Sequence, residues 1–187
     1  MDALQCIAGR RSCRTYEERP VPAAMIDELL RLGTQAATGS GMQPWGFAVL
    51  EGQESIHALS DEIKAWLLPR LKEEPWLAQY EEWLHNESFN IFYNAPALVA
   101  VYGDPSSHWY IYDASLCTAN IMLAAHAQGL GTCWIGFAES FMNRNDIKAR
   151  YNVPEELRLV SVLTLGFARG HLPEAKRRPP RVFYHGS

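Results

Sequence analysis

Residues 113–128 constrain the fold of this chain more than any other stretch. Their hydrophobic side chains lie on nearly all sides of a helix instead of forming one apolar stripe. A helix of this kind has no side suited to water, so we predict a central, buried helix with other elements packed around it. Gly129 suits the left-handed position that ends such a helix. Asn120 lies in the middle and needs a hydrogen-bond partner if buried, and a packing bond is favoured over a ligand contact.

Continuous apolar runs predict the strands of a sheet that packs on this helix. Residues 95–102 form an uninterrupted run, as in a strand buried on both faces. Residues 157–166 give the clearest further strand, residues 46–51 a shorter one, and residues 132–137 a short extended segment. No internal repeat and no linker divides the chain. The order predicts an α+β fold with a central, mostly antiparallel sheet packed among helices, and residues 1–187 as one domain.

Apolar spacing of three and four residues predicts further helices at both ends of the chain. Asp2 caps a short first helix that ends at Gly9, and a second helix runs from Pro22 to about Ala37. A modest helix is expected at about 143–151. These helices supply the layers that cover the sheet.

Residues 53–93 form an unusual pair of helical segments that is rich in aromatic side chains and broken at Pro75. The aromatic residues are explained equally well as core, as a cover over a ligand, or as a surface that embraces a partner subunit. The sequence does not separate these interpretations. We describe the segment as a helical excursion over the site or the dimer surface.

Composition excludes several classes of protein. The chain has 187 residues, 48% hydrophobic and 20% charged, with a net charge of -4, so it offers no basic excess for nucleic acid. No apolar run is long enough to span a bilayer and nothing resembles a signal peptide. The four cysteines form no CxxC pair, so we expect reduced thiols in the cytoplasm. The six histidines are scattered, which makes a metal site unexpected.

The common catalytic motifs are absent from the chain. It has no GxGxxG fingerprint, no P-loop lysine and no GxSxG nucleophile elbow. No Cys–His pair or pair of carboxylates stands out. If the protein is an enzyme, a bound cofactor is expected to carry the chemistry while the chain supplies position and electrostatics.

Two short stretches are candidates for holding a ligand. Arg10, Arg11, Ser12 and Arg14 fall within five residues, and arginine forks suit phosphate oxygens. Taken alone, such a cluster is more often a solvated basic turn. The loop at 38–45 is built from small residues that let a backbone approach a ligand closely, although an ordinary connection is the simpler interpretation.

Four stretches occur in a characteristic order. They read RRSCR followed by PVP, then TGSGMQPW, then DAS through Asn120 to GLGTCWIG, and finally LG with the basic KRR of the tail. Taken together, they are similar to the nitroreductase family of FMN-dependent oxidoreductases. Each motif is weak alone, but together they cover nearly the whole chain outside residues 53–93. The resemblance implies an α+β fold that works as an intertwined homodimer with FMN at the interface.

The resemblance also implies roles for the arginine stretch. Arg10 and Ser12 are expected at the phosphate or ribityl oxygens. Arg14 is expected at the pyrimidine edge of the ring, where its charge stabilises the reduced flavin. Arg11 belongs to the same stretch, with a solvent-facing side chain as the default. Late basic residues, Arg177 and Arg178, would close on the phosphate.

Two further segments are implied to line the ring. The segment Trp134, Ile135 and Gly136 would run along one edge, with the Gly136 backbone N–H directed at N5. The loop from the second subunit would complete the site through Ala37, Thr38, Gly39, Gly41 and Gln43. Gly41 departs from the pattern, because family members commonly carry Asn there, and an amide contact to the flavin is thereby lost. The aromatic pocket is expected to draw on Phe89, Tyr93, Trp109, Phe137 and Phe141.

The activity implied is a ping-pong reaction without a side-chain acid or base. NADH or NADPH gives a hydride to the flavin, and a small aromatic acceptor such as a nitroaromatic, a quinone or another flavin then takes the electrons. One alternative is a specialised flavoenzyme of the same fold, for dehalogenation or heterocycle oxidation. Another is a non-enzymatic dimer that only holds flavin. The physiological acceptor and the choice between NADH and NADPH are not determined by the sequence.

Overall fold

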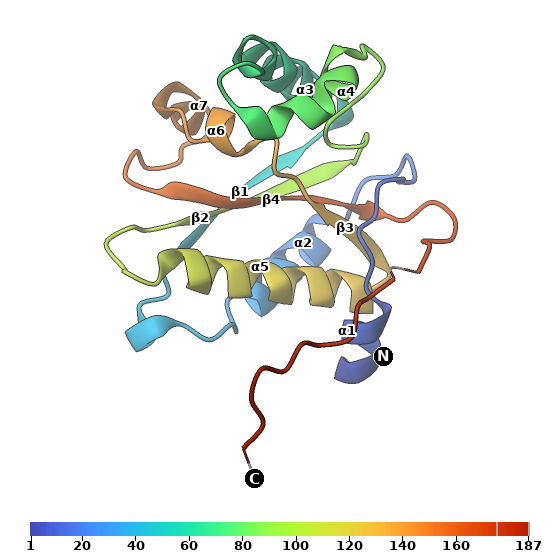
Figure 1. The fold of residues 1–187 in the computed structure, drawn as a ribbon, viewed down its shortest axis with the longest axis vertical. Coiled ribbons are helices and arrows are strands. Elements are labelled where there is room, and N and C mark those ends of the chain that lie inside the picture. Colours follow the sequence, from blue (N-terminus) through green and yellow to red (C-terminus); the bar gives the residue numbers. More distant parts are fainter. Residues whose placement is uncertain (175, 187) are drawn as a thin grey trace.

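An antiparallel sheet of four strands lies at the centre of the computed structural model, which describes residues 1–174 and 176–186. The strands are β1 (Trp45–Glu51), β2 (Ala97–Gly103), β3 (Leu130–Trp134) and β4 (Arg158–Phe167), in the order β1-β2-β4-β3. Every residue of β2 is buried, as its continuous apolar run predicts. Figure 1 shows the sheet between two layers of helices.

The lower layer consists of α5 (Tyr110–Ala127), α2 (Ala23–Gly33) and α1 (Ala3–Gly9). Helix α5 packs on the sheet and on α2 through small and branched side chains, with Cys117, Ile121 and Ala125 fully buried. Asp2 caps α1 by accepting from the Gln5 N–H (2.8 Å), as predicted. A single turn of 3-10 helix, η1 (Gly39–Gly41), follows α2 and ends near the start of α5 (Figure 1).

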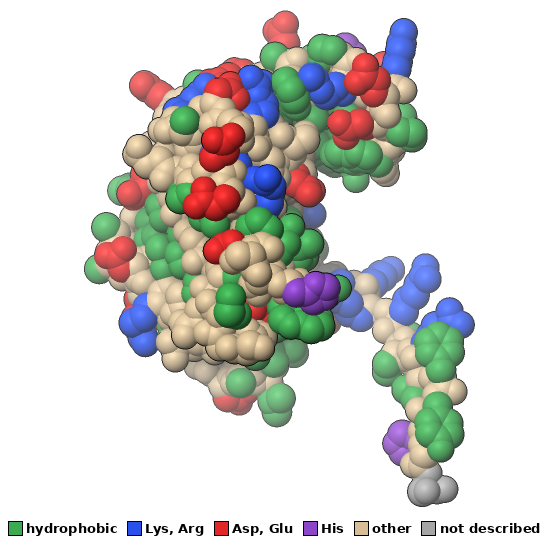
Figure 2. Space-filling model, turned by 90° about the vertical axis from the view of Figure 1, so that its left-hand side faces the viewer, with side chains coloured by type: hydrophobic (Ala, Val, Ile, Leu, Met, Phe, Trp, Pro, Cys, Tyr) green, Lys and Arg blue, Asp and Glu red, His purple; other side chains and the backbone are tan. Residues whose placement is uncertain are grey.

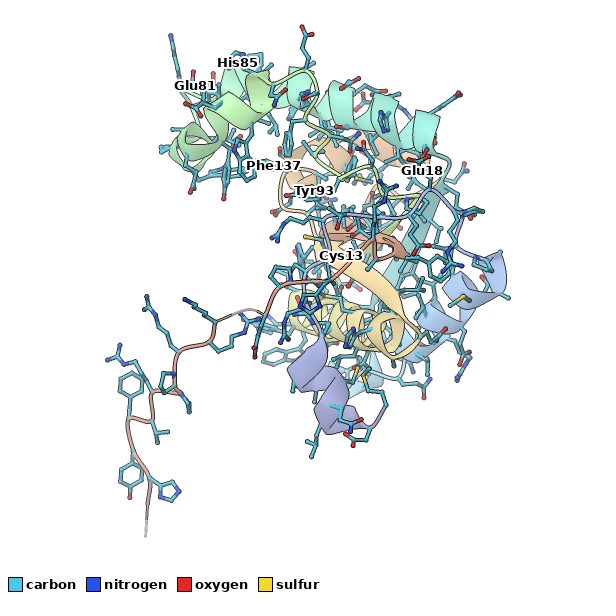
Figure 3. All side chains as sticks on the ribbon, turned by 90° about the vertical axis from the view of Figure 1, so that its right-hand side faces the viewer. Cys13, Glu18, Glu81, His85, Tyr93 and Phe137 are labelled. Carbon is cyan, nitrogen blue, oxygen red and sulfur yellow. The ribbon has the colours of Figure 1, made fainter. Side chains whose placement is uncertain are left out.

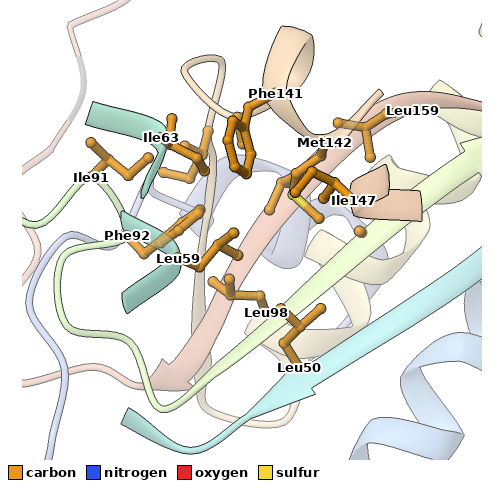
Figure 4. Close-up of a cluster of buried hydrophobic side chains, with 14 of the residues drawn as sticks. Leu50, Leu59, Ile63, Ile91, Phe92, Leu98, Phe141, Met142, Ile147 and Leu159 are labelled. Atoms are coloured by element: carbon orange, nitrogen blue, oxygen red, sulfur yellow. The ribbon is translucent and has the colours of Figure 1, made fainter. Parts of the chain in front are cut away.

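The upper layer consists of α3 (Gln53–Leu67), α4 (Glu81–His85), α6 (Glu139–Met142) and α7 (Asn145–Arg150). Two 3-10 helices, η2 (Leu68–Arg70) and η3 (Pro75–Tyr80), join α3 to α4. Figure 4 shows the core beneath this layer, where α3 side chains meet those of β1, β2 and the segment 89–93. Residues 68–88 project beyond the sheet, and we call them the overhang (Figure 3).

The predicted α+β class and the mostly antiparallel sheet are confirmed, and several details differ. The extended segment expected at 132–137 is the strand β3, Leu130–Trp134, and α6 precedes the helix expected at about 143–151. Helix α2 ends at Gly33 instead of Ala37, because the chain turns at 34–36 to enter the glycine loop. Pro75 does break the helix, but it begins a 3-10 helix rather than a second long α-helix.

Helix α5 is central, as predicted, but within one chain it is buried on only one side. Ile111, Tyr112 and Leu116 are 51%, 64% and 48% exposed on its other side. Asn120 is only partly buried, so its predicted need for a packing bond does not arise. Helix α5 is thus apolar on nearly all sides, but one of these sides is left uncovered within a single chain.

Candidate functional site

The arginine stretch lies along the open edge of β3. The Cys13 N–H donates to the Thr132 carbonyl oxygen (2.9 Å), and Ser12 pairs with Thr132 as a parallel bridge. This close approach requires glycine at 131, because a Cβ there would lie 2.5 Å from the Cβ of Cys13. The sheet therefore fixes the position of Arg14, one residue further on.

A buried group of polar atoms locks the same segment onto β4. The Tyr16 hydroxyl donates to the Cys13 carbonyl oxygen (2.8 Å) and lies 2.6 Å from Thr164 Oγ1. Thr164 Oγ1 in turn accepts from the Cys133 N–H (3.0 Å). Burial raises the pKa of Tyr16 far above its ordinary value, so the phenol stays protonated and acts as a fixed bridge.

A hollow of about 440 Å³ opens beside Arg14 and under the overhang. Arg14, Tyr93 and the segment 133–137 line one side of it, and three aromatic residues of the overhang line the other: Trp76, Tyr80 and Trp83. Tyr93 and Phe137 lie between the overhang and the sheet in Figure 3. The structure thus brings together Arg14, Trp134, Ile135 and Gly136. The resemblance drawn from the sequence assigned these four residues to the same ligand.

Cys133 and Tyr93 line this hollow beside Arg14, and the pKa of each is raised. Burial raises the pKa of the Cys133 thiol, and the charge of Arg14 opposes the shift only in part. A protonated, buried thiol is a poor nucleophile, so Cys133 lines the hollow without a chemical role. Burial also raises the pKa of Tyr93, whose ring lies 5.8 Å from the Arg14 guanidinium carbon.

The backbone of Gly136 stands open to the hollow. A Cβ built on this residue meets nothing within 4 Å, and its φ lies outside the left-handed region. Among the hydrogen bonds of residues 1–174 and 176–186, none uses the Gly136 N–H. An exposed N–H beside empty space is available to a flat ligand that lies along residues 134–136.

Arg10 carries an unsatisfied buried donor. Its Nη1 is buried and finds no hydrogen-bond partner among the described residues. The nearby His126 has a lowered pKa, first because of burial and then because of the charges of Arg10 and Arg11. The surroundings are thus electropositive, and a buried guanidinium N–H without an acceptor fits an anionic group such as a phosphate.

Arg11 and the basic tail are not brought to the hollow. Arg11 Nη1 donates to the carbonyl oxygens of Ala8 (2.6 Å) and Arg10 (3.0 Å), so its guanidinium is engaged at the end of α1. Arg177 and Arg178 are exposed on the extended tail, which leaves the body of the molecule in Figure 2. The solvent-facing side chain expected for Arg11 is not found, because this side chain is only 19% exposed. Contacts of Arg177 and Arg178 with a flavin phosphate stay predictions.

Asp113, at the start of α5, organises the glycine loop. Its buried carboxylate accepts from the Gly39 N–H (3.0 Å) and from Thr38 Oγ1 (2.9 Å). Thr38 Oγ1 accepts in turn from the Gln43 N–H (2.9 Å). Gly41 has a φ of +68°, a conformation that glycine adopts without strain. The loop is therefore shaped by side chains rather than being an ordinary connection.

The glycine loop and the arginine stretch do not meet within one chain. The loop, with Ala37, lies at the start of α5, whereas Cys6 of α1 donates to the Leu123 carbonyl near its end. A helix of 18 residues is about 27 Å long. Figure 1 shows η1 and α1 at opposite ends of α5. The predicted cofactor residues therefore form two half-sites.

Sequence reasoning missed several residues that shape the hollow. Trp76, Tyr80 and Trp83 were visible only as part of an aromatic segment with several interpretations. Of the aromatic residues expected at the pocket, Tyr93 and Phe137 line it. Phe141 belongs to the core, so its assignment to the pocket is wrong. Trp109 packs against Gly39 at the other half-site.

Comparison with known proteins decides the family. A model of the nitroreductase family matches residues 7–167. The chain belongs to the nitroreductase family. This family assignment confirms the resemblance drawn from the sequence and makes the chain an oxidoreductase.

Solved structures share the fold of this nitroreductase-family chain. A nitroreductase with bound FMN from Bacteroides fragilis matches with a TM-score of 0.85 at 25% identity, covering 100% of each chain. An FMN-dependent nitroreductase from Clostridium difficile matches with a TM-score of 0.80 at 26% identity, covering 96% of each. Among relatives found by sequence, the iodotyrosine deiodinase of Thermotoga neapolitana is 24% identical over 183 residues, covering 94% of each chain. The family therefore includes more than one reaction.

Two further findings concern the described part of the chain. No helix within it has both the length and the apolar character needed to cross a membrane. No group of three or more His, Cys, Asp or Glu side chains in residues 1–174 and 176–186 is placed to hold a metal ion.

Proposed function

We propose that this protein is an FMN-dependent oxidoreductase that takes a hydride from NADH or NADPH and reduces nitroaromatics, quinones or flavins. The observation that carries the proposal is the open Gly136 backbone in the same hollow as Arg14. The unsatisfied Nη1 of Arg10 adds an anion-binding group on the same edge of the sheet. These features fit a ligand with a flat ring and a phosphate.

When bound, FMN accepts a hydride from NAD(P)H, which leaves as NAD(P)⁺, and passes on two electrons and two protons, one of them from solvent. A nitro group then becomes a nitroso group and water, and a quinone becomes a hydroquinone. Donor and acceptor use the same place in turn, which is a ping-pong reaction.

The chain supplies binding, orientation and charge. Arg10 and Ser12 would hold the phosphate end, and Arg14 would lie at the pyrimidine edge, where a fixed positive charge favours the anionic reduced ring. The Gly136 N–H would donate toward the N5 edge, with Trp134 and Ile135 beside it. Tyr93 and the overhang exclude water from the ring face. No side chain needs to act as an acid or base.

We further propose that the active form is a homodimer. Ile111, Tyr112 and Leu116 are exposed on α5, and Leu4 and Ile7 are exposed on α1, which packs near the other end of α5. Burial of this surface against a second copy would bring the partner's glycine loop, through Thr38, Gly39, Gly41 and Gln43, to the Arg14 half-site. The two half-sites of one chain, separated along α5, would thereby complete two flavin sites.

The remaining assignments rest on the same argument. We propose that residues 1–187 form one flavin-binding domain and that Arg177 and Arg178 close on the phosphate. We also propose a cytoplasmic location, which is supported by the four cysteines, all free and buried. No nucleic acid or membrane takes part in this function.

Steady-state kinetics test the proposal. The protein loaded with FMN should oxidise NADH or NADPH when a nitrobenzene or a benzoquinone is present. Double-reciprocal plots at several acceptor concentrations should give parallel lines. Intersecting lines, or no turnover with any nitroaromatic or quinone by protein that retains FMN, would contradict the proposed reaction.

Reductive dehalogenation is the second candidate, favoured by the iodotyrosine deiodinase relative. The hollow accepts a flat aromatic ring in either case. Halide release from a halogenated tyrosine by reduced, FMN-loaded protein, measured beside nitroaromatic reduction, separates the two. Halide release without nitroaromatic reduction would favour the second candidate.

A further inference from the structure

The overhang presents a continuous aromatic wall to the proposed flavin site. Tyr80 and Phe137 meet edge to face with ring centroids 5.0 Å apart, and Trp76 stacks on Phe137 at 6.3 Å. Trp83 extends the wall from Tyr80 at 6.0 Å. Trp76 and Trp83 line the hollow and are nonetheless 46% and 49% exposed. Exposed tryptophan on a cavity wall is typical of a surface that binds flat rings.

The wall is rigidly attached to the body of the molecule. Lys64 of α3 is buried and donates from Nζ to the carbonyl oxygens of Asn86 (2.8 Å) and Phe89 (3.0 Å). Leu77 and Leu84 of the overhang are themselves buried. The aromatic wall is therefore preformed, and the groups around it set which rings it accepts.

A second hollow of about 410 Å³ adjoins the first and carries negative charge. The two share Trp76 and Gly136, and the second is also lined by Glu74 and Glu139. The Trp76 indole N–H donates to Glu74 Oε2 (2.8 Å), which fixes this carboxylate beside the aromatic wall. Glu139 is exposed at the start of α6. A ring lying along Gly136 would thus direct one end toward two carboxylates.

Two arginines near this acidic end, Arg70 and Arg144, are engaged elsewhere. Arg144 pairs with Asp146 (2.7 Å) and lies over the Trp66 ring. Arg70 stacks on the same ring and donates to the Trp66 carbonyl oxygen. Of the described residues that line the two hollows, Arg14 alone is a lysine or arginine, and the proposed function assigns it to the flavin. The overhang itself has five glutamates against one arginine and one lysine.

We propose that this site selects planar aromatic acceptors with a neutral or cationic substituent and discriminates against carboxylated ones, with Glu74 and Glu139 as the residues that determine this specificity. The proposal rests on the proposed function, because it names the acceptor class of that site. A cationic substituent is attracted by both carboxylates and by the ring faces of the wall. An anionic substituent meets like charge, which penalises the wrong partner.

The test uses three acceptors that share the 4-nitrobenzyl group and differ in the charge of the substituent: 4-nitrobenzyltrimethylammonium, 4-nitrobenzyl alcohol and 4-nitrophenylacetate. FMN-loaded protein is reduced anaerobically with dithionite, and its second-order reoxidation rate by each acceptor is measured by stopped flow. Reduction by dithionite removes any effect of charge on NAD(P)H binding. We expect the cation to react about tenfold faster than the anion at low salt, with the alcohol between them. The ratio should shrink as ionic strength rises.

Two double variants assign the effect. Glu74→Gln with Glu139→Gln keeps an acceptor oxygen for Trp76 and should bring the cation-to-anion ratio close to that of the free flavin. Glu54→Gln with Asp61→Asn removes the same charge from exposed positions of α3 and should leave the ratio of the unmodified protein. Equal rates for all three acceptors, faster reaction of the anion, or an equal loss in both variants would overturn the proposal. Failure of reduced protein to react with any acceptor would instead contradict the proposed function.

Discussion

The side chain of Cys13 occupies the space that a side chain at residue 131 would need. A Cβ on Gly131 would lie 2.5 Å from Cys13 Cβ and 2.6 Å from its Sγ. These atoms belong to a buried residue close to its own backbone, so they cannot move aside as the end of a flexible side chain can. The contact holds the arginine stretch against β3, and with it the position of Arg14.

Gly131→Ala is predicted to push the arginine stretch off β3. Overpacking of this kind costs about 1–3 kcal/mol of the free energy of unfolding. FMN affinity should fall as well, because Arg14 moves with Cys13. Urea unfolding and FMN titration measure the two effects. Gly136→Ala is the matched control for stability, since its Cβ meets nothing within 4 Å. Equal stability of the two variants would contradict the prediction.

Arg14→Ala is predicted to weaken FMN binding without unfolding the chain. The side chain is exposed and lines the hollow, and loss of a charge-assisted contact corresponds to about ten- to a hundred-fold in Kd. Fluorescence titration with FMN provides the measurement.

Arg11→Gln is the companion variant, because the Arg11 guanidinium donates to carbonyl oxygens of its own chain. It should lower stability more than it lowers FMN affinity. If Arg11→Gln released FMN as strongly as Arg14→Ala, the division of roles between the two arginines would be wrong. A partner-binding dimer without redox function would instead retain its partner in Arg14→Ala and show no redox change.

Acidification is predicted to destabilise the protein through His126. Burial, followed by the charges of Arg10 and Arg11, lowers the pKa of His126 in the folded state. The unfolded chain then binds the proton more readily, so this contribution to the free energy of unfolding is present above the ordinary histidine pKa of about 6.5 and is lost as pH falls through it. Between pH 7.5 and 5.5, a range that spans the ordinary histidine pKa, the free energy of unfolding should fall less in His126→Gln than in the unmodified protein.

The same histidine reports on the anion site. In the proposed site, bound FMN would place a phosphate near Arg10 and offset the positive charge, so the pKa of His126 should rise. NMR titration of the imidazole protons with and without FMN measures the shift. An unchanged or lowered pKa in the FMN-bound protein would contradict the placement of the phosphate beside Arg10.

Leu116→Glu is predicted to separate the proposed dimer and to release FMN with it. Leu116 is 48% exposed within one chain, so the substitution leaves the core of the monomer intact. A charge at the centre of an apolar interface disfavours association. Light scattering gives the mass and absorbance gives the bound flavin. Ala65→Glu, on the exposed side of α3 in the opposite layer, adds the same charge and should change neither quantity. A dimer in Leu116→Glu would place the interface elsewhere.

Local patterns predicted the elements of this fold well. The run at 95–102 became β2 because a strand buried on both faces needs apolar side chains throughout. The α5 pattern also predicted a helix without a water-facing side, although one side awaits a partner in the single chain. Arg14 and Gly136 were assigned to one site through the family resemblance, and the structure places both at the same hollow.

Contacts between distant residues were beyond the reach of sequence patterns. Asp113 shapes the glycine loop through a hydrogen bond with Thr38, which lies 75 residues away in the chain. The residues next to either partner give no sign of this bond. The approach of Cys13 to Gly131 depends on the register of β3, which no local motif encodes. The aromatic wall likewise depends on a 3-10 helix at Pro75 that turns Trp76 and Tyr80 toward Phe137.

The absorbance spectrum of the purified, FMN-reconstituted protein under anaerobic conditions tests the central claim most directly. The account predicts a bound flavin with absorbance near that of free FMN, retained on gel filtration at one per chain and bleached on addition of NADH or NADPH. Protein that binds no FMN, or that binds it but is bleached by neither nicotinamide, would contradict the account.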